Sequence, residues 1–233
     1  LHDALPIYFV EDIEQRYHIR VLLVDDYKEI QIILNELNSR IRSKRVFVSG
    51  AFSSFTSEIE EYSHNLSRNL ASSLLENDYR IVNGIGRRFG THLIGYANEY
   101  LAKQGVKDIE KHLIVKPFVG NTQAAAEEKY RSRKKVIGQC GTAIFVFGEM
   151  SENSSATKSG VMEEFEIACE QHKTIIPIAY PGMVSEIIWE KVKGELTRYP
   201  YLEGRIDLLT SVQSPEFLSQ IIIHILDSVQ ESM

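Results

Sequence analysis

Cysteine is nearly absent from this chain, and so are long apolar runs. The 233 residues include two cysteines, Cys140 and Cys169, which lie far apart and form no CxxC pair. That spacing argues against a zinc ribbon or a disulfide framework, and we interpret both as buried thiols in a reducing cytosol. No stretch reaches the roughly 18 apolar residues of a transmembrane helix. The start, LHDALPI, lacks the basic segment and apolar core of a signal peptide. We therefore expect a cytoplasmic protein without membrane contact.

An excess of positive charge is also missing. The formal net charge is −6 at pH 7, which argues against nucleic-acid binding, because that function needs a broad positive surface. The seven histidines form no HxxxH or HxH pair, so no metal site is predicted. No serine lies in a nucleophile elbow, and no catalytic residue is assigned. The basic residues are clustered, however, so a local anion-binding site is not excluded by the net charge.

Apolar runs alternate with helical patterns from residue 44 to residue 233. The predicted strands are 45–50, 79–84, 112–118, 142–148 and 173–180, and the predicted helices are 57–76, 89–103, 122–140, 160–172 and 215–230. This alternation predicts an α/β, Rossmann-like three-layer fold with a mostly parallel sheet and helices on both faces. The carboxyl ends of all strands then lie at one edge, where such folds bind ligands.

Residues 1–43 are assigned to a separate part of the chain. Their first residues look like a translated sequencing-adapter scar and are left out of the fold. The run IRVLLV at 19–24 predicts a buried strand, and apolar residues recur at helical spacing from Ile30 to Leu37. We expect this strand and helix to be the last unit of an upstream α/β domain.

Glycine-containing turns follow three of the predicted strands. Glycine lets backbone N–H groups approach an anion closely, and the helix that begins after each turn attracts phosphate. The motif GxGxxxG is one residue off the dinucleotide fingerprint, so a tight turn with solvated arginines is an equal interpretation of it alone. Convergence of several turns at one edge favours a phosphate site. Its residues would be Ser49, Gly50, Gly84, Gly86, Arg87, Gly90 and Gly148.

Two helices add charged candidates. In EEKYRSRKKV, Arg133 lies beside the apolar stripe and Arg131 points further out. An arginine beside the stripe is unfavourable to desolvate unless it meets an anion, although a solvated basic face is the usual interpretation of such a run. In KSGVMEE, the serine and glutamates serve either helix capping or hydrogen bonds to ribose hydroxyls or an adenine amine. The ligand-binding candidates here are Arg131, Arg133, Lys158, Ser159, Gly160 and Glu164.

The segments VFVSGAF, IVNGIGRRFG, YRSRKK, TAIFVFG and SGVMEEFEIA together resemble the SLOG superfamily, which includes the LOG and Smf proteins, over about residues 44–233. More closely, they resemble the sensor domain of Thoeris anti-phage defence effectors. The segment RYHIRVLLVDDYKEIQIILNEL is similar to the end of the sirtuin-like domain that comes first in those effectors.

The resemblance implies a pocket with an arginine on the third helix, a lysine after the fourth strand and a glutamate on the next helix. The arginine corresponds to Arg133, with Arg131 as second choice, and the glutamate to Glu164. Glu149 stands where the lysine is expected, and Lys158 is assigned in its place.

The resemblance also implies what the pocket is for. The domain would sense a cyclic ADP-ribose isomer, or a related ADP-ribose nucleotide, that a TIR-domain partner protein makes. Binding would activate the attached sirtuin-like domain, which depletes cellular NAD. A homo-oligomer without a cofactor is expected. The fragment itself would be no enzyme, whereas the full-length protein would be an NAD hydrolase.

An enzyme is kept as the alternative function. LOG-type phosphoribohydrolases carry the motif PGGxGTxxE, whereas this chain reads KSGVMEEFE and lacks the double glycine and the threonine. A hydrolase would cleave an N-glycosidic bond with Glu163 or Glu164. An assembly domain that binds no nucleotide is the third possibility.

Overall fold

A computed structural model describes residues 5–53, 56–118, 123–150 and 159–231. The chain divides into two compact units, Leu1–Arg40 and Ile41–Met233. None of the described helices is both long and apolar enough to cross a bilayer.

The first unit differs from its prediction in one element. It contains α1 (Leu5–Tyr17), which begins inside the segment left out of the fold, and most of α2 (Tyr27–Ser43). The predicted strand at 19–24 does not form, and Leu22 and Leu23 are 65% and 68% exposed. A strand requires a neighbour for its backbone hydrogen bonds, and no described strand pairs with this run. Apolar, β-branched composition alone was therefore insufficient to predict a strand at 19–24.

The second unit is built on a five-stranded sheet in which every pair of neighbours is parallel. The strands are β1 (Arg45–Ala51), β2 (Arg80–Asn83), β3 (Leu113–Val115), β4 (Thr142–Phe147) and β5 (Thr174–Ile178), in the order β3-β2-β1-β4-β5. Strands β1 and β4 are almost wholly buried because helices cover both of their faces, and this explains their continuous apolar sequence.

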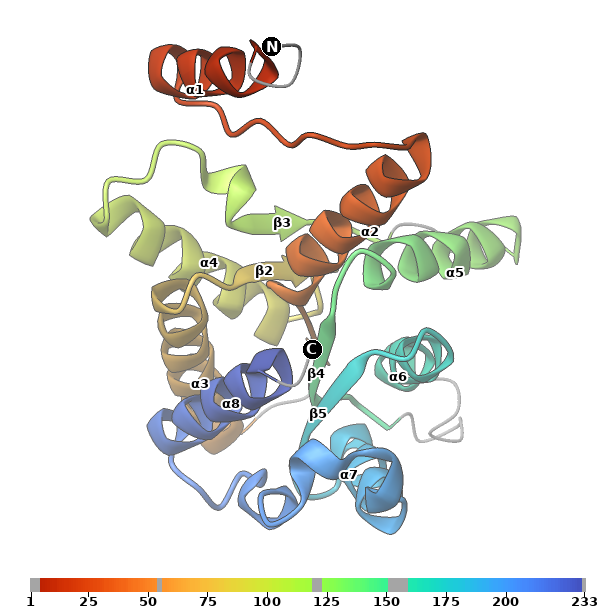
Figure 1. Cartoon of the computed structure of the whole chain (residues 1–233). Helices are drawn as coiled ribbons and strands as arrows, with labels where there is room; N and C mark the ends of the chain where they lie inside the picture. The colour runs from red at the N-terminus through yellow and green to blue at the C-terminus, as the bar shows by residue number, and fades with distance from the viewer. Residues whose placement is uncertain (1–4, 54–55, 119–122, 151–158, 232–233) are drawn as a thin grey trace. The chain divides into compact units, whose positions relative to one another are not determined.

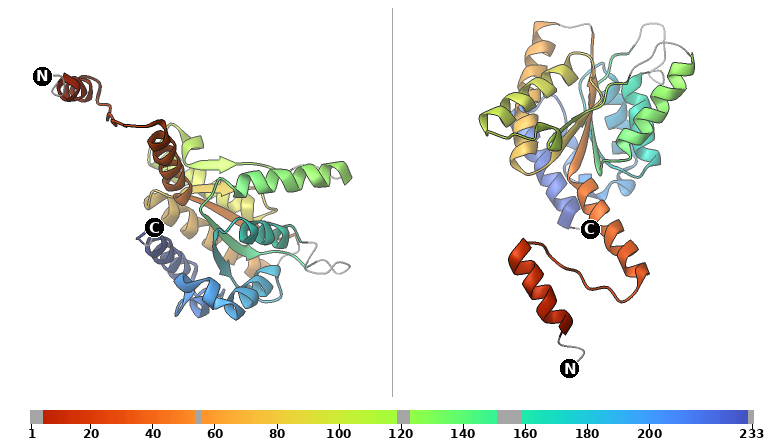
Figure 2. Two further views of the ribbon diagram at one scale, coloured as in Figure 1. Left: turned by 45° about the vertical axis from the view of Figure 1, so that its right-hand side comes forward. Right: turned by 90° about the horizontal axis from the view of Figure 1, so that it is seen from above.

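The helices form two layers around the sheet. One face carries α3 (Ser57–Glu76), α4 (Phe89–Lys103) and α8 (Pro215–Glu231), and the other carries α5 (Gln123–Ile137) and α6 (Gly160–Glu170) (Figures 1 and 2). After β5 come α7 (Val184–Gly194) and short 3₁₀ turns at Leu196–Arg198, Pro200–Leu202 and Ile206–Leu208; another, Ile109–Lys111, precedes β3. The predicted three-layer, Rossmann-like α/β fold is confirmed.

The strand order reverses direction beside β1, and this reversal positions the site. From β1 the chain builds outward through β2 to β3, and then returns to place β4 on the other side of β1. The connections that leave the carboxyl ends of β1 and β4 therefore turn toward opposite faces. In open parallel sheets a crevice forms at that point, and ligands bind in it.

Candidate functional site

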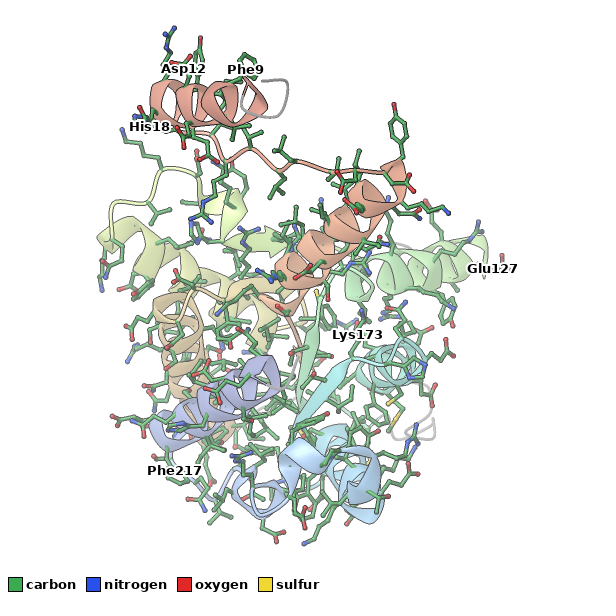
Figure 3. All side chains as sticks on the ribbon, viewed as in Figure 1. Phe9, Asp12, His18, Glu127, Lys173 and Phe217 are labelled. Carbon is green, nitrogen blue, oxygen red and sulfur yellow. The ribbon has the colours of Figure 1, made fainter. Side chains whose placement is uncertain are left out.

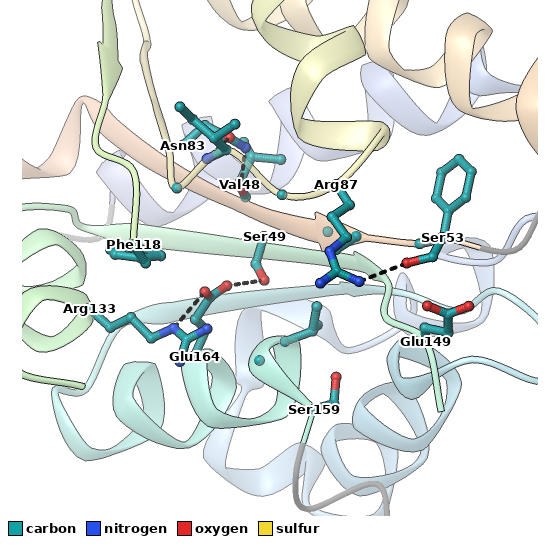
Figure 4. Close-up of a pocket in the computed structure, with 18 of the residues that line it drawn as sticks. Val48, Ser49, Ser53, Asn83, Arg87, Phe118, Arg133, Glu149, Ser159 and Glu164 are labelled. Atoms are coloured by element: carbon teal, nitrogen blue, oxygen red, sulfur yellow. Dashed lines mark hydrogen bonds and ion pairs between the residues drawn. The ribbon is translucent and has the colours of Figure 1, made fainter. Parts of the chain in front are cut away.

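A cavity of about 510 Å³ lies at this reversal point, at the carboxyl ends of the strands. Its walls come from the turns after β1 and β2, from Phe118 after β3, and from α5 and α6 (Figure 4). The structure brings together most of the site residues predicted from the sequence. Those that line the cavity are Ser49, Gly50, Gly84, Gly86, Arg87, Arg133, Ser159, Gly160 and Glu164.

Three predicted residues lie outside the cavity lining. A Cβ at Gly90 would lie 2.9 Å from Asn83 Oδ1, and Gly148 adopts a φ of +94° with no room for a side chain beside Val184, so both glycines serve packing. The Arg131 side chain is 76% exposed and pairs with Glu127, which Figure 3 labels on the outer part of α5. A further predicted site residue, Lys158, lies outside the described residues.

The first wall of the cavity consists of residues 49–53 and 83–87, and we call it the glycine wall. A Cβ at Gly86 would lie 2.0 Å from the carbonyl oxygen of Gly50, so the two turns approach each other through bare backbone. A Cβ at Gly84 would lie 2.2 Å from the ring of Phe118. These glycines are therefore required by the packing of the turns, whatever the cavity binds.

Asn83 fixes the glycine wall, and the sequence analysis missed it. Its Nδ2 donates to the carbonyl oxygen of Val48 at 2.8 Å, and its Oδ1 accepts from the N–H of Ile85 at 2.7 Å. The side chain thus joins the end of β2 to the neighbouring β1, and the residue is 1% exposed. The available signal was an asparagine at the end of an apolar strand, directly before a glycine turn.

The second wall consists of Lys129 and Arg133 on α5 and of residues 159–164 at the start of α6, and we call it the charged wall. Arg133 Nε donates to Glu164 Oε1 at 3.0 Å, and Ser49 Oγ donates to Glu164 Oε2 at 2.5 Å (Figure 4). Arg133 Nη1 also pairs with Glu163. Arg133 and Glu164 are each 8% exposed, so this pair is almost entirely removed from solvent, whereas the Glu163 side chain is 33% exposed.

The network changes the interpretation of Arg133. Its burial beside the apolar stripe was taken to require an anion, and the anions that it meets here are the carboxylates of Glu163 and Glu164. Burial raises the pKa of Glu164, while Arg133 and the Ser49 hydroxyl oppose that rise. The carboxylate is thus held as a hydrogen-bond acceptor at the base of the cavity.

Two further cations face the cavity. Arg87 donates from Nη1 to Ser53 Oγ at 3.1 Å and lies on the glycine wall. Lys129 lies one helical turn before Arg133 and has no ion pair or hydrogen bond with any described residue. The sequence analysis missed Lys129, because it stands in a basic run that is typical of a solvated helix face. Together these groups suit an anion with hydroxyl groups, since cations bind phosphate and a carboxylate accepts from hydroxyls.

Comparison with known proteins identifies relatives of the chain. A model of the Sir2- and TIR-associating SLOG family matches residues 29–229. The NAD(+) hydrolase ThsA of Bacillus cereus (strain MSX-D12) is 30% identical over 215 residues, which cover 91% of this chain and 44% of that protein. The protein of the same name from Enterococcus faecium is 30% identical over 191 residues, 79% of this chain and 38% of its own length. The chain therefore spans about two fifths of the relatives that it matches.

Proposed function

The chain belongs to the Sir2- and TIR-associating SLOG family, as its motifs predicted, and we propose that its cavity is a sensor site for an ADP-ribose nucleotide. The preferred ligand is a cyclic ADP-ribose isomer. The observation that carries this proposal is the pairing of two unlike walls around one cavity. On the glycine wall, the backbone of two turns lies close to the Arg87 side chain. On the charged wall, Lys129 accompanies the buried carboxylate of Glu164.

The pyrophosphate and a ribose hydroxyl of such a ligand each have a proposed counterpart in the cavity. A pyrophosphate carries about two negative charges, and each hydrogen bond to a charged group contributes about 1.5–3 kcal/mol. Arg87 and Lys129 are placed to make these bonds. A ribose hydroxyl would donate to Glu164, which already accepts from Ser49 and Arg133. Several such contacts together support micromolar or tighter binding.

We further propose the role of this site in the full-length protein. The relatives are named as NAD(+) hydrolases, and the family is described as associated with Sir2 and TIR. A TIR-domain partner protein would make the nucleotide in Thoeris-type anti-phage defence. Binding would then activate an attached sirtuin-like domain, in a homo-oligomer, to deplete NAD. Such a switch works only if the ligand prefers the active arrangement.

A phosphoribohydrolase is the second candidate function, and one observation favours it. Burial raises the pKa of Glu164, as a general acid requires. Both carboxylate oxygens of Glu164 are nevertheless engaged, one by Ser49 and one by Arg133. This engagement suits a carboxylate that binds hydroxyls better than one that transfers a proton to a leaving base, and the sensor is therefore preferred.

One experiment separates these functions. The purified chain is incubated with cyclic ADP-ribose isomers, ADP-ribose, NAD and AMP, its thermal unfolding is followed, and the nucleotides are then separated by chromatography. At a ligand concentration of 100 Kd, a ligand that binds only the folded state stabilises it by about 2.7 kcal/mol. We expect a raised melting temperature with a cyclic isomer and recovery of that isomer unchanged.

The other outcomes contradict the sensor proposal. Release of a free base from any nucleotide would identify the hydrolase. Absence of a thermal shift with every nucleotide would favour an assembly domain that binds none of them.

A further inference from the structure

A second polar cluster lies on the opposite side of the sheet from the charged wall, between α3 and α4. Among the described residues, Glu60, His64 and His92 form a group whose potential ligand atoms all lie within 4.8 Å of one another. Glu60 and His64 are four residues apart on α3, so they share one face of that helix. His92 comes from the first turns of α4, which packs against α3.

The distances in this cluster are close to those of a metal site. His92 Nε2 lies 3.5 Å from Glu60 Oε1, and His64 Nε2 lies 3.8 Å from the same oxygen. Two tetrahedral ligands held about 2.0–2.1 Å from zinc lie about 3.4 Å apart. Each nitrogen is therefore within a few tenths of an ångström of the separation from Glu60 Oε1 that a shared ion requires, although the ring orientations must still change.

Each imidazole has a hydroxyl group beside its Nδ1 atom. The Nδ1 atom of His92 lies 3.0 Å from Ser63 Oγ, and the Nδ1 atom of His64 lies 3.0 Å from the hydroxyl of Tyr96. In the tautomer in which Nδ1–H donates to this hydroxyl, the Nε2 atom is left for the ion.

Two features of the cluster must change when an ion binds. The rings of His64 and His92 are stacked with their centroids 3.8 Å apart, so one ring must rotate before both lone pairs meet at one point. The His64 side chain is 42% exposed and has room to do so. Arg88 Nη1 lies 3.3 Å from both oxygens of Glu60. Its side chain is 36% exposed, and it would give up Oε1 to the ion.

We propose that Glu60, His64 and His92 bind a divalent transition-metal ion of the zinc class. Two imidazole nitrogens and one carboxylate oxygen form a donor set that suits zinc, with water as the fourth ligand. The sequence analysis predicted no metal site because it searched for paired histidines, and this set combines a glutamate-to-histidine spacing on one helix with a histidine from another. The proposal is independent of the nucleotide function.

The position of the cluster gives the ion a structural consequence. His92 lies in α4, which begins directly after the glycine wall. An ion held by α3 and α4 would fix the start of α4, and with it one end of the turn that lines the cavity. Bound metal should therefore raise the thermal stability of this chain even when no nucleotide is present.

The test is a metal titration of the purified chain after treatment with a chelator. Zinc chloride is followed by calorimetry, and cobalt chloride by the visible spectrum of tetrahedral Co²⁺. We expect one ion per chain. His92→Ala and His64→Ala should each weaken binding at least tenfold. His64→Ala is the safer variant, because that side chain is the more exposed of the two.

The matched control is His112→Ala, which removes a histidine that lies outside the cluster. It should bind zinc as the unaltered chain does. The proposal is overturned if the unaltered chain binds neither metal at micromolar concentration. It is equally overturned if His64→Ala and His92→Ala retain the affinity and the cobalt spectrum of the unaltered chain.

Discussion

The glycine wall and the charged wall enclose one cavity but are held in different ways. The glycine wall is fixed by backbone, since a single Cβ at Gly86 would meet the carbonyl oxygen of Gly50 at 2.0 Å. The charged wall is fixed by side chains, with Arg133 bonded to Glu164 and paired with Glu163. The backbone of the glycine wall therefore has a single arrangement. The charged wall consists of polar partners that a ligand is able to replace.

We expect the two walls to respond differently when a ligand binds. Close backbone contacts have no side-chain rotamers to change, so the two turns of the glycine wall should keep their spacing when a ligand binds. A network of charged side chains exchanges its bonds when a new anion or hydroxyl arrives. We therefore expect changes in the glycine wall to alter stability and affinity together, and changes in the charged wall to separate the two.

The largest effect is expected from Arg133→Met. The substitution leaves Glu164 buried without its cationic partner, and breaking a buried pair in this way lowers the free energy of unfolding by about 3 kcal/mol. The measurement is urea unfolding of the purified chain. A loss below about 0.5 kcal/mol, the usual range of surface substitutions, would show that the network does not hold the charged wall.

The double variant Arg133→Met/Glu164→Gln sharpens this result. The amide needs no cation, so part of the lost stability should return, whereas nucleotide affinity should not. Calorimetric titration that finds normal affinity in the double variant would remove both residues from the ligand site.

An intermediate effect is expected from Gly86→Ala. The added Cβ must push apart the turns after β1 and β2, and overpacking of this kind lowers the free energy of unfolding by about 1–3 kcal/mol. Nucleotide affinity should fall in the same variant. Thermal unfolding and calorimetry measure the two quantities.

Gly95→Ala is the matched control for that variant. A Cβ at Gly95, inside α4, would meet no atom within 4 Å. Because alanine favours a helix over glycine, stability should rise by about 0.5–1 kcal/mol. Equal destabilisation by both substitutions would contradict the close backbone approach of the glycine wall.

The smallest change in stability is expected from Lys129→Ala. Lys129 faces the cavity without a described partner, so unfolding should change by less than about 0.5 kcal/mol. Affinity for an ADP-ribose nucleotide should fall about tenfold, or about 1.4 kcal/mol. Arg131→Ala, on the same helix but outside the cavity lining, should change neither quantity. Equal losses of affinity in both variants would indicate general attraction by the basic helix rather than a contact in the site.

The sequence predicted which turns form the site better than it predicted the contacts that their residues make. Parallel strands place their carboxyl ends at one edge, so the turns at Gly50 and Gly86 could be assigned to one site from the order of elements alone. The purpose of these glycines could not be predicted, because their contacts join turns that are about 35 residues apart. The strand predicted at 19–24 failed for a related reason, since pairing depends on a neighbour that local composition does not specify.

For the charged residues too, the sequence predicted local features but not contacts between distant segments. Helical periodicity placed Arg133 near the buried side, and the structure confirms its burial. It did not predict that Glu163 and Glu164 are its partners, because α6 lies beyond β4 in the chain. Lys129 was missed because a basic run has the same appearance whether it faces solvent or a cavity.

Phe118 touches both walls at once. A Cβ at Gly84 would lie 2.2 Å from its ring, and the guanidinium carbon of Arg133 lies 5.4 Å from the ring centroid. If the proposed ligand drew Arg133 away from its glutamates, the ring of Phe118 would lose the cation that lies over its face. Phe118 is therefore the residue through which a movement of Arg133 would reach the turn at Gly84.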